Sequence, residues 1–170
     1  MEIHRKLIIK EINKRYSTEE ALRNVLHYIV REKESEKGKE VRYWKAFGAS
    51  GHNINKVIKQ FIQIQKLYGK NNKKRIRHFL ISFPFYMDDP NIAKLTAEAV
   101  SEFFFKEYQV VYAVHEKKEN LHIHFALNPV SYKTKMKWHK SKPEFMEWKK
   151  EVHKIVNQCF KENGYEKCEM

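Results

Sequence analysis

The stretch VYAVHEKKENLHIHFALN, residues 111–128, contains three histidines within ten positions: His115, His122 and His124. Its residue pattern is that of two β-strands, and side chains alternate between the two faces of a strand. His122 and His124 therefore share one face of the second strand. The other face is entirely apolar, so we expect it to be the core side and the histidines to point away from the core. This apolar face consists of Leu121, Ile123, Phe125 and Leu127.

Residues 117–120 form a connection short enough to close a β-hairpin between the two strands. Pairing that is symmetric about this loop sets His115 opposite His122, and Ala113 opposite His124. Cross-strand partners point to the same face, with Cβ atoms about 5 Å apart. The three imidazole rings are therefore predicted to converge.

Three converging imidazoles are typical of a metal site. Three imidazolium charges at this spacing would repel one another, whereas neutral rings offer lone pairs to a cation. Three protein ligands leave coordination positions open, which is the pattern of a catalytic site. Imidazole alone favours zinc, manganese or nickel, while phosphate oxygens of a bound substrate favour magnesium or manganese. We predict a divalent metal, Mg²⁺ or Mn²⁺, with Zn²⁺ and Ni²⁺ as alternatives.

The charge of the chain indicates a polyanionic partner. Its 170 residues are enough for one domain, which we expect to span residues 1–170. Lysine and arginine outnumber aspartate and glutamate by 34 to 21, a formal net charge of +13. The excess gathers in two runs without acidic residues, KNNKKRIRH at 70–78 and KTKMKWHKSK at 133–142. One such run is often only a solvated face, but two runs interleaved with aromatic residues favour a polyanion.

The two cysteines, Cys159 and Cys168, lack metal-type spacing, so we expect a reducing compartment and no disulfide framework. No apolar run approaches the roughly 20 residues of a membrane span, and the charged N-terminus has no signal-peptide core. The sequence predicts a cytoplasmic protein without membrane insertion.

Apolar periodicity and turn residues divide the chain into alternating strands and helices. Ser17 with Glu20, and Ser141 with Glu144, have the spacing of helix capping boxes. The predicted fold class is an α/β sandwich, with a mainly antiparallel central sheet and helices packed on one side of it. Strands are expected at 3–9, 40–48, 76–85, 109–117 and 121–130, and helices at 16–34, 53–69, 90–108 and 141–164.

The histidine segment also resembles a known family, the HUH endonucleases, and within it the MOBP-like relaxases of plasmid mobilisation and conjugation. HEKKENLHIHFALNPV, at 115–130, looks like the third motif of that family. His115, His122, His124 and Asn128 stand at the spacing of this motif. The resemblance implies that the three histidines hold the metal.

Two earlier segments are similar to the other motifs of the family. HFLISFP, at 78–84, is similar to the second motif, and Ser82 stands at its serine. LRNVLHYIV, at 22–30, looks like the first motif, in which the tyrosine before isoleucine is the nucleophile. That tyrosine is Tyr28. The relaxases carry it before the histidine pair, as here, whereas HUH replication initiators usually carry it after.

Helical geometry supports Tyr28 independently. At about 100° per residue, Tyr28 lies about 110° from the middle of the apolar stripe of its helix, on the side of Asn24 and Arg31. Arg31 is placed to contact a phosphate beside the phenol. Tyr16, near the start of the helix, is the reserve candidate for the nucleophile.

The resemblance implies a transesterification that nicks and rejoins single-stranded DNA through a 5′-phosphotyrosine and a free 3′-OH. His115 is expected to be catalytic as well as a ligand, since a histidine of the cluster or a water accepts the phenolic proton. Implied partners are single-stranded DNA at an origin of transfer, accessory relaxosome proteins and a type IV coupling protein. Expected DNA contacts are Arg31, Ser82, Asn128, Lys73, Lys74, Arg75, Lys135 and Lys137, with Tyr43, Trp44, Tyr132 and Trp138 as base-stacking surfaces.

The sequence departs from the family pattern at Lys117, where members commonly have an acid two residues after the first histidine of the third motif. Glu116 and Glu119 are the candidate substitutes for this acid. Two other functions stay open. One is a rolling-circle replication initiator with the same chemistry. The other is a non-catalytic basic DNA-binding module whose histidines form a structural metal site.

Overall fold

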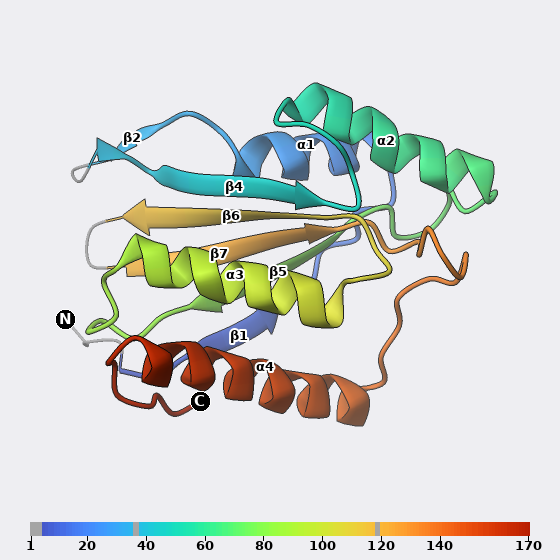
Figure 1. Cartoon of the computed structure of the whole chain (residues 1–170). Helices are drawn as coiled ribbons and strands as arrows, with labels where there is room; N and C mark the ends of the chain where they lie inside the picture. Colours follow the sequence, from blue (N-terminus) through green and yellow to red (C-terminus); the bar gives the residue numbers. More distant parts are fainter. Residues whose placement is uncertain (1–4, 36–37, 118–119) are drawn as a thin grey trace.

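The computed structural model describes residues 5–35, 38–117 and 120–170. Its main sheet has five strands in the order β1-β5-β7-β6-β4, and every neighbouring pair is antiparallel (Figure 1). A separate pair of two-residue strands, β2 and β3, was not predicted. The strands are β1 (Ile8–Glu11), β2 (Glu34–Ser35), β3 (Gly38–Lys39), β4 (Val41–Phe47), β5 (Arg77–Ser82), β6 (Val110–Lys117) and β7 (Asn120–Leu127).

Helices cover both faces of this sheet (Figure 1). One face packs against α3 and α4 through side chains such as Phe125, and the other against α1 and α2 through Val111, Ala113 and Ala126. The predicted α/β sandwich with an antiparallel sheet is confirmed. The prediction that the helices pack on one side of the sheet was wrong. The four helices are α1 (Glu19–Ile29), α2 (Ile54–Leu67), α3 (Pro90–Phe104) and α4 (Lys142–Glu162).

Helix α1 differs from its predicted bounds at both ends. Its first turn is capped by Thr18, whose hydroxyl accepts a hydrogen bond from the backbone N–H of Ala21 at 3.0 Å, so the expected Ser17 cap was wrong by one position. The helix stops at Ile29, which leaves carbonyl groups at its C-terminal end without helical partners. The predicted capping box of α4 is present, with Ser141 and Glu144 bonded reciprocally.

The hairpin of β6 and β7 has the predicted register. His115 pairs with His122, and Ala113 pairs with His124. The histidines point away from the core formed with α3 and α4, as expected, but their face is also covered, because α1 packs over β6 and β7. His115 is 0% exposed. Among the described residues, no helix has the length and apolarity needed to cross a membrane.

Candidate functional site

Three histidine side chains converge on the α1 side of the sheet. One nitrogen from each of His115, His122 and His124 lies within 4.8 Å of the other two. The ring centroids are 4.3 Å apart for His115 and His124, and 4.9 Å apart for His122 and His124. We call these residues the histidine triad. The convergence predicted from the hairpin register is therefore present.

The hydrogen bonds of the triad decide which nitrogens are available. Nε2 of His115 lies 2.6 Å from the carbonyl oxygen of Ile29, at the end of α1, so Nε2 carries the proton and Nδ1 keeps its lone pair. Nδ1 of His115 and Nδ1 of His122 are buried and have no hydrogen-bond partner among the described residues. A buried acceptor left unsatisfied costs about 1–3 kcal/mol. A divalent cation would satisfy both atoms, so the triad fits a metal.

Burial keeps the triad neutral. It lowers the pKa of His115 to about 4 and that of His122 to about 3. The pKa of His124 is also lowered, first by burial and then by the neighbouring His115. Rings that stay neutral near pH 7 offer lone pairs instead of positive charge, as metal ligands must.

Tyr28 lies beside the triad, in the last turn of α1. Its ring centroid is 5.9 Å from that of His124 and 6.5 Å from that of His115. The side chain is 46% exposed, so a macromolecular substrate can reach the phenol. The distance of Tyr28 from the apolar stripe of α1 accounts for this exposure.

Arg31 and Glu40 hold the other side of this centre. The Arg31 guanidinium carbon lies 4.0 Å from the centroid of the Tyr28 ring, and the same group donates to Glu40 at 2.9 Å. Glu40 is 1% exposed, and its carboxylate lies 3.9 Å from Nδ1 of His115 and 3.3 Å from the amine of Lys117. Burial alone would raise the pKa of Glu40, but the bond from Lys117 and the charge of Arg31 outweigh it and lower that pKa.

Glu40 corrects the expectation about the missing acid. Glu116 lies next to His115 on β6 but forms its ion pair with Arg42, at 3.6 Å. Glu119 lies outside the described residues. A buried carboxylate beside His115 comes instead from Glu40, the residue before β4, and Lys117 binds this carboxylate. No local motif indicates Glu40, since only sheet pairing brings it to the triad.

A family model for "Relaxase: MobA/VirD2-like, nuclease domain" matches residues 28–165, a segment that begins at the tyrosine and includes the whole triad. The chain belongs to this family. The fold agrees: a solved chain described under "Molecular Basis of Vancomycin Resistance Transfer in Staphylococcus aureus" superposes with a TM-score of 0.70 at 16% identity, over 97% of each chain. No curated protein matches the sequence.

A fourth buried histidine extends the centre of this relaxase. His78, on β5, places Nε2 at 2.7 Å from Nδ1 of His124, which leaves Nε2 of His124 for a metal. Burial lowers the pKa of His78 to about 4. The hydroxyl of Tyr16 lies 3.5 Å from the other nitrogen of His78, so His78 links Tyr16 to the triad. No role for His78 was predicted from the sequence, although this residue opens the second motif.

Ser82 of the second motif and Asn128 of the third motif both form hydrogen bonds within the protein. Ser82 pairs with His122 across β5 and β7, and its hydroxyl donates to the side chain of Asn120 at 3.2 Å. Asn128 is 0% exposed, and its amide bonds the side chains of Gln65 and Gln109. The expectation that Asn128 contacts DNA is therefore wrong for this structure, because its amide is buried in a polar network.

The two basic runs of the relaxase fold against each other. The amine of Lys137 donates to the carbonyl oxygen of Asn72 at 2.6 Å, which joins residues 133–142 to residues 70–78. Burial and neighbouring positive charges lower the pKa of Lys137, and burial lowers that of Lys74. A cluster of cations that repel one another favours an anionic ligand.

Some of the remaining residues predicted to contact DNA are exposed and others are buried. Lys73 and Lys135 are exposed, whereas Arg75 is 7% exposed and its guanidinium bonds Gln65. Trp138 is also 7% exposed and lies in the core with α4, so neither Arg75 nor Trp138 is open to DNA as predicted.

Proposed function

We propose that this relaxase domain, taken as residues 1–170, nicks and rejoins one strand of DNA at an origin of transfer by transesterification through Tyr28. The observation that carries the proposal is the exposed phenol of Tyr28, whose ring lies 5.9 Å from that of His124 in the triad. A nucleophile beside open metal coordination positions is the arrangement that phosphoryl transfer requires.

The reaction exchanges one phosphodiester for another. The Tyr28 oxygen bonds to phosphorus, the bond from phosphorus to the 3′ oxygen breaks, and the DNA is left with a free 3′-OH and a 5′-phosphotyrosine. The phenol loses its proton to water, which reaches this exposed side chain, and the leaving 3′ oxygen gains a proton. His115 acts as a ligand and not as the base, since its Nε2–H is donated to Ile29 and a metal on the triad would take the remaining lone pair, on Nδ1. A divalent metal on the triad, Mg²⁺ or Mn²⁺, would stabilise charge on the phosphoryl oxygens.

Arg31 has two tasks in this proposal. One nitrogen donates to the carbonyl oxygen of Tyr28 at 2.6 Å and another donates to Glu40, so the guanidinium is fixed against the phenol. Its remaining N–H donors bond a phosphate oxygen of the bound strand. The positive charge also stabilises the phenolate that forms during attack.

The lysines of the two basic runs, of which Lys73 and Lys135 are exposed and Lys74 and Lys137 half-buried, hold the DNA backbone. Lys73, Lys74, Lys135 and Lys137 contact phosphates, and binding weakens as salt rises. The proposed setting is the cytoplasm, with relaxosome proteins and a type IV coupling protein as further partners. The same chemistry at a replication origin would make the protein an initiator, and the family match favours transfer.

A covalent adduct tests the proposal. The protein is incubated with Mn²⁺ and a random-sequence pool of single-stranded oligonucleotides, then separated on a denaturing gel. We expect a slower-migrating protein–DNA band with the wild type and with Tyr16→Phe, and no band with Tyr28→Phe. Absence of the band from the wild type and from both variants would indicate a non-catalytic DNA-binding module. Loss of the band in Tyr16→Phe alone would show that Tyr16 is the nucleophile.

A further inference from the structure

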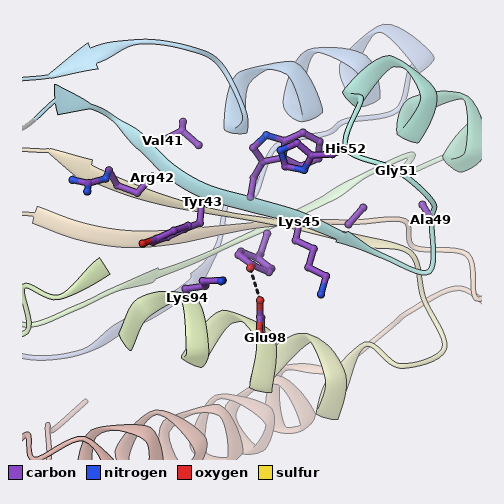
Figure 2. A pocket seen from close by; sticks show the side chains of 12 residues that line it. Val41, Arg42, Tyr43, Lys45, Ala49, Gly51, His52, Lys94 and Glu98 are labelled. Atoms are coloured by element: carbon purple, nitrogen blue, oxygen red, sulfur yellow. Dashed lines mark hydrogen bonds between the residues drawn. The ribbon is translucent and has the colours of Figure 1, made fainter. Parts of the chain in front are cut away.

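A groove of about 590 Å³ follows β4, the edge strand of the main sheet (Figure 2). It lies on both sides of this strand, with His52 above it and Tyr43 and Lys94 below it in the view of Figure 2. None of its lining residues belongs to the histidine triad. The lining is Val41, Arg42, Tyr43, Trp44, Lys45, Ala46, Ala49, Gly51, His52, Lys94, Glu98 and Tyr112.

The groove begins next to the catalytic centre. Val41 pairs with His115, so this end of the groove is one strand away from the triad. Trp44 pairs with Ala113, which pairs in turn with His124. Neighbouring strands are about 4.8 Å apart, so the backbone of Trp44 lies about 10 Å from that of His124. A strand of DNA that leaves the centre across β6 therefore meets β4.

The upper wall of the groove is a pair of stacked rings. The centroids of Trp44 and His52 are 3.8 Å apart and the ring planes differ by 14°. Trp44 packs against the core on the α1 side, whereas His52 is exposed. The loop that brings His52 back over β4 turns at Gly48 and Gly51, with φ of +72° and +91°. One side of the stack is thus anchored in the core and the other is open to a further ring.

The groove is positively charged. Arg42, Lys45 and Lys94 line it, and the one acidic residue of the lining, Glu98, accepts a hydrogen bond from the hydroxyl of Tyr112 at 2.9 Å (Figure 2). The amine of Lys94 lies 5.2 Å from the centroid of the Tyr43 ring. Cations interleaved with aromatic rings are the features by which proteins bind single-stranded nucleic acids without reading their sequence.

We propose that the β4 groove is a second binding site for the DNA strand that Tyr28 cleaves. A base flanking the cleaved phosphate stacks on the open side of the Trp44–His52 pair, and Arg42, Lys45 and Lys94 hold the adjoining phosphates. The ligand is single-stranded, because paired bases have no free face to offer. This inference rests on the proposed function for the identity of the strand. A peptide that adds to the edge of β4 is the rival ligand, and charged residues on that edge disfavour it.

The test measures binding by fluorescence anisotropy in EDTA, with a fluorescein-labelled oligothymidylate of 20 nucleotides and an abasic oligomer of the same length. We expect Trp44→Ala and His52→Ala to weaken oligothymidylate binding about tenfold and to leave abasic binding unchanged. Lys45→Ala weakens the binding of both oligomers. It also lowers the number of counterions released on binding, read from the salt dependence of the affinity, by about one. Trp44→Phe retains a ring and most of the affinity, and controls for folding.

Phe103→Ala is the control for a general effect of removing an exposed aromatic ring. Phe103 is 65% exposed and lies outside the groove. Wild-type affinity for oligothymidylate in both Trp44→Ala and His52→Ala would overturn the inference. An equal loss on the abasic oligomer would overturn it too, because it would show that no base stacks there. If the covalent adduct forms while these variants bind normally, the groove inference alone fails. If the variants lose affinity but no adduct ever forms, the groove stands and the proposed cleavage fails.

Discussion

His124 links the triad to a fourth buried histidine, His78 on β5. Its Nδ1 contacts Nε2 of His78 at 2.7 Å, and the hydroxyl of Tyr16 lies 3.5 Å from the other nitrogen of His78. If Nε2 of His124 binds a metal, its Nδ1 carries the proton and donates a hydrogen bond to Nε2 of His78. His78 then acts as a positioning residue that sets the tautomer and orientation of a ligand.

This role predicts a loss of metal affinity without a loss of ligands. His78→Ala should weaken Mn²⁺ binding at least about tenfold, because the partner of a ligating imidazole orients it. His78→Gln should retain part of the affinity, since its amide oxygen also accepts a hydrogen bond. Isothermal titration calorimetry with MnCl₂ measures both effects, and His139→Ala, an exposed histidine away from the triad, is the control. Equal Mn²⁺ affinity in all three variants would contradict the role.

At the scale of single residues, the sequence predicted the positions that depend on the β6–β7 hairpin alone. The spacing of His115, His122 and His124 is enough to place three rings on one face, because strand alternation and a tight loop leave little freedom. Glu40 and His78 could not be found in this way. They reach the triad through the pairing of β4 with β6 and of β5 with β7, and no local pattern encodes which distant strands become neighbours.

At the scale of elements, the end of β7 is tied to α2 by a buried amide network. Asn128 bonds Gln65 on α2, Gln109 before β6, the carbonyl oxygen of Phe61 and the backbone N–H of Val130. This network fixes the helix against the strand that carries His122 and His124. It also explains why a motif residue of the family is buried here.

Asn128→Ala should therefore act on stability and not on DNA contacts. Removal of the amide leaves buried partners unsatisfied, which costs about 2–3 kcal/mol in the free energy of unfolding. Urea denaturation followed by circular dichroism measures this loss, and Asn24→Ala, exposed on α1, is the matched control. Unchanged stability together with weaker binding of oligonucleotides would restore Asn128 as a DNA contact.

The elements themselves were mostly predictable, since each apolar period and cap is local. The layering was not recovered, although the sequence carried a signal for it. Residues 110–114 of β6 are apolar at successive positions, which is typical of a strand buried on both faces. The histidines suggested that this face is polar and open to solvent. Ala113 and Ala126, on the same face, are apolar and indicate that a helix covers it.

At the scale of the whole molecule, four of the histidines in the described part of the chain are buried, and they link the stability of the fold to pH. Burial lowers the pKa of His78 and of His115 to about 4 and that of His122 to about 3, and it lowers the pKa of His124 as well. The unfolded chain keeps values near 6.5, so between about 4 and 6.5 it binds more protons than the folded protein. The free energy of unfolding must then decrease as pH falls through this range.

The metal-free protein should accordingly lose about 1 kcal/mol per pH unit for each of these histidines below pH 6.5. Urea denaturation in EDTA at pH 7.5, 6.5 and 5.5 measures the slope, and His122→Gln should reduce it. Between pH 6.5 and 7.5 the stability should be nearly constant. A flat profile down to pH 5 would mean that the histidines are solvated and protonated in the folded state.

The central claim is that Tyr28 becomes bonded to DNA beside a metal held by the histidine triad. Mass spectrometry of proteolytic peptides tests it most directly, after incubation with Mn²⁺ and single-stranded DNA and then nuclease trimming. We predict a nucleotide phosphate on the peptide that contains Tyr28, absent when EDTA replaces Mn²⁺ and absent in His122→Ala. A nucleotide on any other residue, or one that forms equally well in EDTA, would contradict the account.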